Sequence, residues 1–133
     1  MKIKVTAKNY PQEVLRSETP VLVEFFAVWC WKCAMMEDIV DEIAEEYDGR
    51  AKVCQIEIEE SAVLAAEYEV NVVPTFVVFR EGKPVNYASG VLGKEVLTEM
   101  LEIWKTAFGW REIPFNPEAV VYNDEKIKKI TKK

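Results

Sequence analysis

The stretch Trp29-Cys30-Trp31-Lys32-Cys33 lies at the point where an apolar run ends and a helical pattern begins. Two cysteines separated by two residues, in the first turn of a helix that follows a buried strand, are placed to exchange a dithiol for a disulfide. The free N–H groups and partial positive charge of a helix N-terminus stabilise a thiolate on Cys30, and the cation of Lys32 adds to this effect. Such surroundings lower the pKa of a cysteine thiol from ~8.5 to roughly 3.5–7.5, so we expect Cys30 to be reactive.

The residues before this stretch predict a strand in the middle of a sheet. The run from Val21 to Val28 is β-branched, aromatic and almost wholly apolar, as in strands that are buried on both faces. Glu24 is the exception, and a carboxylate is costly to bury in such a run unless it has a partner. Glu24 is therefore either a strand-end carboxylate paired with another group or a functional residue.

The residues after the stretch follow the helical period from Trp31 to Tyr47. Apolar side chains recur there at spacings of three and four, and acidic side chains fill the other side. Asp48-Gly49 is a typical helix end. We expect one long amphipathic helix whose acidic face is exposed to solvent.

The remaining segments alternate between strand and helix patterns. Strands are predicted at 3–6, 53–58, 74–80 and 85–88, and helices at 10–16, 61–68 and 96–104. The short link Glu81-Gly82-Lys83-Pro84 indicates a hairpin, so the two strands beside it should be antiparallel. This order predicts an α/β protein with a central mixed β-sheet flanked by helices on both faces.

A chain of 133 residues has the length of one domain, and its character changes near residue 108. We expect a domain at 1–107 and a C-terminal extension at 108–133, partly irregular, with a short strand at 119–122 and a basic tail. The tail, residues 126–133, contains five lysines, and we expect it to be solvated. An arm that docks on an acidic partner is the alternative. Trp110 and Phe115 either pack on the domain or mark a contact site.

Composition argues against several classes of function. The net charge of -6, from 23 acidic and 17 basic residues, argues against binding to nucleic acid. The absence of histidine removes Ser/His and Cys/His catalysis and leaves only cysteine and carboxylate side chains as metal ligands. Three cysteines are too few for a secreted disulfide framework, the N-terminal residues lack the apolar region of a signal peptide, and no stretch is apolar for the ~18 residues of a membrane span. We expect a cytoplasmic protein with no membrane partner.

From roughly Val5 to Trp104 the chain resembles the thioredoxin family. The matching features are residues 21–30 (VLVEFFAVWC), the second cysteine Cys33, Val73-Pro74-Thr75, the Glu81-Gly82-Lys83 turn and Gly90. A pair of cysteines two residues apart is a weak signal by itself. Its combination with Val-Pro-Thr about forty residues later, and with the order of strands and helices, is a strong one.

The resemblance implies a thioredoxin fold and a thiol–disulfide oxidoreductase that reduces protein disulfides. It implies that no metal or organic cofactor is needed, and that a thioredoxin-reductase-like electron donor restores the dithiol. By the same resemblance, Cys30 is the exposed nucleophile and Cys33 the buried resolving thiol. Glu24 stands where the family usually has a buried aspartate beneath the second cysteine, which implies that it accepts the proton of Cys33.

The resemblance also implies a surface that binds the substrate. Trp29 matches the tryptophan before the first cysteine, and Gly90 matches a glycine that lines the substrate groove. Pro74 matches the family's cis-proline, which faces the cysteines and leaves the neighbouring backbone at Val73 free to pair with an extended substrate.

Two departures from the family pattern change what we expect. Trp31 and Lys32 replace the usual Gly-Pro between the cysteines. Because an exposed, rigid aromatic is a good anchor for a partner, we hypothesise that this pair sets partner choice as well as reactivity. Gln55 replaces a lysine that often neighbours the buried acid, and without that cation burial should raise the pKa of Glu24.

Other interpretations of the same residues remain open. Cys30 and Cys33 could be structural, or contribute half of a zinc site or of a cluster shared between two subunits. The third cysteine, Cys54, lies in a predicted strand and should be a small buried side chain. In place of an enzyme, the chain could be a redox-inactive thioredoxin-fold adaptor that holds a partner through Trp31 and the basic tail. An intermediate possibility is a reductant dedicated to one enzyme.

Overall fold

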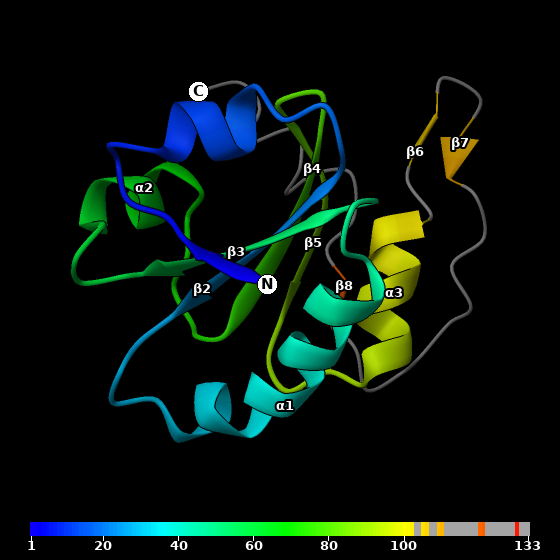
Figure 1. The fold of residues 1–133 in the computed structure, drawn as a ribbon. Helices are drawn as coiled ribbons and strands as arrows, with labels where there is room; N and C mark the ends of the chain where they lie inside the picture. The colour runs from blue at the N-terminus through cyan, green and yellow to red at the C-terminus, as the bar shows by residue number, and fades with distance from the viewer. Residues whose placement is uncertain (103–104, 107–108, 111–119, 122–129, 131–133) are drawn as a thin grey trace.

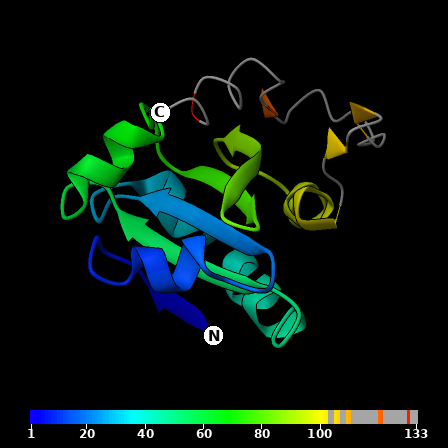
Figure 2. The same ribbon diagram turned by 90° about the horizontal axis from the view of Figure 1, so that it is seen from above.

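Among the described residues, six strands form one mixed sheet in the order β1-β3-β2-β4-β5-β8, with helices on both of its faces (Figures 1 and 2). The structure is a computed structural model that describes residues 1–102, 105–106, 109–110, 120–121 and 130. Its elements are β1 (Lys2–Lys4), η1 (Pro11–Leu15), β2 (Val21–Phe26), α1 (Trp31–Glu46), β3 (Lys52–Glu57), α2 (Ala62–Glu67), β4 (Thr75–Arg80), β5 (Lys83–Ser89), α3 (Lys94–Glu102), β6 (Lys105–Thr106), β7 (Gly109–Trp110) and β8 (Val120–Val121).

The strand β2 lies in the interior of the sheet. It pairs in parallel with β3 and antiparallel with β4, so that Glu24 has Gln55 on one side and Phe76 on the other. The strands β4 and β5 form the antiparallel hairpin that the sequence predicts, and β1 adds to the free edge of β3 in parallel. This arrangement confirms the expected mixed sheet of the thioredoxin fold.

Two buried clusters, one on each face of the sheet, explain why β2 is apolar at almost every position. Side chains alternate between the faces of a strand, so residues two apart share a face. Val21, Val23 and Phe25 pack with side chains of η1 and α2, while Leu22 packs with side chains of α1 and α3. Glu24 follows Leu22 by two residues and is therefore directed at the α1 side, where it is almost completely buried.

The helix α1 begins immediately after Cys30. Cys30 has extended backbone angles, and its sulfur accepts a hydrogen bond from the N–H of Cys33, so it caps the helix. Met36, Val40 and Ile43 face the core, as the helical period predicts. The helix ends at Glu46 with Tyr47 as its C-cap, and Gly49 then adopts a positive φ of 83°, which glycine tolerates without a steric penalty.

Several element boundaries differ from the sequence predictions. The first strand ends at Lys4 and not at Thr6, because the Thr6 N–H donates to Asn9 Oδ1 and no longer joins the sheet. The central strand ends at Phe26, since the chain turns there and the Cys30 N–H donates to the Ala27 carbonyl. The segment 10–16 forms η1, a short helix of the wider π type.

Part of the C-terminal extension packs on the domain. The predicted strand at 119–122 is β8, which pairs antiparallel with β5 at Ala88 and Ser89. Ile130 is buried in the cluster under η1 and α2, so the expectation of a fully solvated tail is wrong at this residue. The other tail residues, Phe115 and the side chain of Trp110 lie outside the described part of the chain. The boundary between 107 and 108 stays a prediction.

Candidate active site

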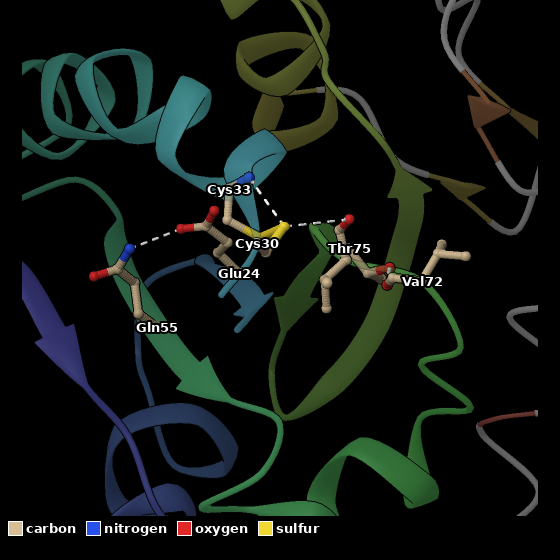
Figure 3. Close-up of a disulfide and its surroundings, with 7 residues drawn as sticks. Glu24, Cys30, Cys33, Gln55, Val72 and Thr75 are labelled. Atoms are coloured by element: carbon tan, nitrogen blue, oxygen red, sulfur yellow. Dashed lines mark hydrogen bonds between the residues drawn. A yellow bond between two sulfur atoms is a disulfide. The ribbon is translucent and has the colours of Figure 1, made fainter. Parts of the chain in front are cut away.

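Cys30 and Cys33 form a disulfide at the N-terminus of α1 (Figure 3). Their Cα atoms are 5.3 Å apart, which is a usual separation for bonded cysteines. The loop after β2 brings Cys30 to this place, and the first turn of α1 brings Cys33. The disulfide packs in a small cluster with Ala27, Phe26 and Val73.

The two sulfur-bearing residues are not equally accessible. Cys30 keeps 9% of its surface exposed and Cys33 only 3%. Cys30 Sγ accepts the N–H of Cys33 at 3.1 Å, and it lies 3.7 Å from the carbonyl oxygen of Val73. Because an N–H donor at a helix N-terminus stabilises negative charge, a thiolate formed on Cys30 by reduction is favoured here.

The peptide bond between Val73 and Pro74 is cis, as the resemblance implies. The Gly90 N–H donates to the carbonyl oxygen of Pro74 at 2.9 Å, and Gly90 has a positive φ of 101°. The neighbouring Thr75 donates through Oγ1 to the carbonyl of Val72 at 2.7 Å (Figure 3). The structure therefore brings Val73, Pro74 and Gly90 together beside Cys30.

In Figure 3 the side chain of Glu24 reaches from β2 toward the disulfide, with its carboxyl group on the Cys33 side. Gln55 Nε2 donates to its Oε1 at 2.7 Å, and its Oε2 has no hydrogen-bond partner among the described residues. Burial raises the pKa of Glu24 to about 7, against the opposing effect of the Gln55 hydrogen bond. This upward shift confirms the prediction from the sequence that burial raises the pKa of Glu24. A carboxyl group that titrates near neutral pH can both accept and release a proton under ordinary conditions.

Two tryptophans flank Cys30 at the surface. Trp29 is 64% exposed, and its Nε1 donates to Glu59 Oε1 at 2.6 Å. Trp31 is 67% exposed, and Lys32 Nζ lies 5.8 Å from the centre of its ring. The loop after β3 thus holds Trp29 in place, whereas Trp31 is available for contact with a partner.

Two residues beside the site were missed by the sequence analysis. Glu59 fixes the indole of Trp29, and no local pattern marks it, because it belongs to a run of acidic residues after β3. Met35 is 56% exposed and follows Trp31 by four residues, so the two share one face of α1. The helical spacing alone could have found Met35.

The described residues contain no group of three or more histidine, cysteine, aspartate or glutamate side chains placed to hold a metal ion. None of the helices in the same part of the chain is long and apolar enough to cross a membrane. Cys54 is fully buried in β3, as predicted, and burial raises the pKa of its thiol to about 12. The third cysteine is therefore kept as an inert thiol away from the disulfide.

Comparison with known proteins finds relatives that span most of the chain. The family model described as Thioredoxin matches residues 1–103. Thioredoxin 1 of Nostoc sp. is 39% identical over 99 residues, which are 74% of this chain and 92% of the relative. Thioredoxin of Pyropia yezoensis is 40% identical over 98 residues, with the same two shares. Thioredoxin of Staphylococcus saprophyticus is 36% identical over 100 residues, which are 75% of this chain and 94% of the relative.

Proposed function

This chain belongs to the thioredoxin family, and from that membership we propose that it reduces protein disulfides with Cys30 as nucleophile and Cys33 as resolving thiol. It is a thiol–disulfide oxidoreductase, so the alternative of a redox-inactive adaptor is set aside. The observation that most supports the proposed roles is the difference in accessibility between the two bonded cysteines at the N-terminus of α1.

In the proposed reaction, the Cys30 thiolate attacks one sulfur of the substrate disulfide and releases the other sulfur as a thiolate. The product is a mixed disulfide between Cys30 and the substrate. Cys33, deprotonated, then attacks Cys30 Sγ and releases the second substrate thiolate, leaving a Cys30–Cys33 disulfide. Two electrons pass from the dithiol to the substrate, and no organic cofactor is needed to hold them.

Glu24 is the proposed acceptor of the Cys33 proton. It is a buried carboxyl group that reaches toward the Cys33 side of the disulfide (Figure 3), and its pKa near 7 allows it to be ionised when the mixed disulfide resolves. Its Oε2, to which no group in the described part of the chain donates, supports this role, because such an oxygen has a free lone pair for a proton.

The proposed binding surface for the substrate surrounds Cys30. Val73 and Pro74 would align an extended segment of the substrate beside the disulfide, and Gly90 would leave room for its backbone. Trp29 supplies a fixed apolar wall. Trp31 and Lys32 would contact the substrate directly and set which proteins are preferred, since both extend from the first turn of α1 at the surface.

Thioredoxins act on disulfides and receive electrons from a reductase. We propose that this chain works in the cytoplasm as an electron carrier between a thioredoxin-reductase-like donor and protein disulfides. The free, buried thiol of Cys54 and the net charge of -6 support this proposal, since they suit a reducing compartment and argue against nucleic acid as a partner.

Trapping of the mixed disulfide tests the proposed roles. A Cys33→Ser variant should accumulate covalent adducts with insulin that dithiothreitol releases, because nothing can resolve the bond to Cys30. The matched Cys30→Ser variant should form none. If both variants form adducts equally, or neither does, the assignment of nucleophile and resolving thiol is wrong.

A further inference from the structure

An ion-pair cluster joins β1 to α1. Lys2 Nζ lies 2.5 Å from Glu37 Oε2 and 2.8 Å from Asp41 Oδ1. The Lys2 side chain is mostly covered, whereas the two carboxylates are about half exposed. Although burial lowers the pKa of Lys2, its hydrogen bonds to Asp41 and Glu37 outweigh that effect and raise it, so Lys2 stays a cation through the neutral range.

The sheet register places Lys2 on the same face of the sheet as Glu24, two residues before Lys4, which is the β1 residue in line with Gln55 and Glu24. Lys2 pairs with Val53, which pairs in turn with Leu22, and both of these partners pack against α1. Since residues two apart share a face, Lys2 and Glu24 are both directed at α1, with β3 between their strands. On α1, Glu37 and Asp41 follow Cys33 by one and two turns.

The charged groups that face Glu24 therefore come from two elements. Glu37 and Asp41 lie on α1, and Lys2 and Lys4 lie on β1, where Lys4 is in register with Gln55 and pairs with Glu60 at 3.2 Å. The neighbour on β3, Gln55, and the neighbour on β4, Phe76, are uncharged. After burial and the Gln55 hydrogen bond, the carboxylates of Glu37 and Asp41 raise the pKa of Glu24 and the Lys2 cation lowers it.

We propose that Lys2, held by Glu37 and Asp41, is a positioning residue that sets the pH at which Glu24 gives up its proton. The neutral Gln55 cannot supply a charge that compensates the buried carboxylate. Lys2 supplies a positive charge from β1, the second strand from β2, and the two acidic residues of α1 fix its place and oppose its effect on Glu24. The inference rests on the proposed role of Glu24 as proton acceptor.

The proposal predicts that two sets of substitutions in this cluster shift the pKa of Glu24 in opposite directions. Replacing the cation by Lys2→Met should raise the pKa of Glu24, because the attraction is lost and two carboxylates remain. The double variant Glu37→Gln with Asp41→Asn should lower it, because the Lys2 cation remains unopposed. For charges at this distance and exposure we expect shifts on the order of half a pH unit in each direction. Added salt should reduce both shifts, because the carboxylates are half exposed.

Direct titration of the Glu24 carboxyl carbon by NMR in the oxidised full-length protein measures these shifts. Glu24→Gln identifies the resonance. Lys94→Met is the matched control, because Lys94 also pairs with two carboxylates of α1, Glu42 at 3.3 Å and Glu46 at 2.6 Å, and it should leave the titration unchanged. Lys2→Arg should restore the wild-type midpoint, which separates the charge from any general effect of changing β1.

Shifts of opposite sign in the two variants support the proposal. Shifts of the same sign, no shift, or a Lys94→Met shift as large as that of Lys2→Met overturn it. The proposed role of Glu24 fails separately: if Glu24→Gln leaves the rate of mixed-disulfide resolution and its pH profile unchanged, Glu24 is not the proton acceptor, whatever the cluster does to its titration.

Discussion

Gln55 Nε2 donates a hydrogen bond of 2.7 Å to Glu24 Oε1, and the second carboxyl oxygen of Glu24 has no partner among the described residues. A single neutral donor cannot replace the hydration that the carboxylate loses in a fully buried position. The protonated form is therefore favoured, and the pKa of Glu24 is about 7 in the folded chain against 4.5 for an unperturbed carboxyl group.

This difference predicts that folding stability falls as the pH rises. Between pH 4.5 and 7 the folded state holds a proton on Glu24 that the unfolded state has lost, so the free energy of unfolding decreases through this window. The full contribution is about 3 kcal/mol, lost above pH 7. Urea unfolding at pH 5 and pH 9 measures it. In Glu24→Gln the decrease should be smaller by about this amount, and an identical decrease in both proteins contradicts the prediction.

Replacement of Trp31-Lys32 by Gly-Pro should change which substrates are preferred. An exposed tryptophan at the centre of an interface commonly contributes more than 1 kcal/mol to binding, so we expect kcat/KM for insulin to change about tenfold relative to oxidised glutathione. Val63→Ala is the control, since Val63 is also exposed but lies on α2. Unchanged kinetics toward every substrate tested would show that the pair has no role in partner choice.

The reduced protein should present two reactive thiols and one inert thiol. Cys54 is fully buried and burial raises the pKa of its thiol to about 12, so little thiolate exists at neutral pH. Mass spectrometry after brief alkylation of the native protein should show modification at Cys30 first and none at Cys54. Denaturant should make all three cysteines react. Fast modification of Cys54 in the native state would contradict its described burial.

Ile130 should contribute to stability although it follows a lysine-rich sequence. Its side chain is 3% exposed and packs in the cluster under η1 and α2, so Ile130→Ala should cost about 2–5 kcal/mol in the free energy of unfolding. Val63→Ala, at an exposed position, should cost less than about 0.5 kcal/mol. Equal midpoints for the two variants in urea would contradict the packing of this residue.

The fold was predictable from sequence where the pattern is local. The apolar run before Cys30, the helical period after it and the Glu81-Gly82 turn give the central strand, α1 and the hairpin, because each follows from side-chain periodicity or turn chemistry. Glu24 could be singled out as an exception within its strand. The cis bond before Pro74 was expected from the resemblance and not from the local pattern.

The structural features that the sequence did not predict depend on contacts between segments that lie far apart in the chain. The hydrogen bond from Trp29 to Glu59 and the ion pair between Lys2 and Glu37 join residues 30 or more positions apart. In the sequence these charged residues resemble ordinary solvent-exposed residues, so nothing marks them as partners. The early end of β1 depends on Asn9, which offers the Thr6 N–H another partner. The burial of Ile130 depends on the path of the extension, which composition does not determine.

The equilibrium of the Cys30–Cys33 couple with glutathione is the first measurement to make. The protein is equilibrated at graded ratios of reduced to oxidised glutathione, its free thiols are trapped, and the products are weighed by mass spectrometry. We expect one reversible two-electron transition confined to Cys30 and Cys33, with a potential near the ~ -270 mV of thioredoxin for a general reductant, or nearer ~ -180 mV for a partner-specific or isomerase role. A chain in which these cysteines stay unlinked at every ratio would contradict the proposed function.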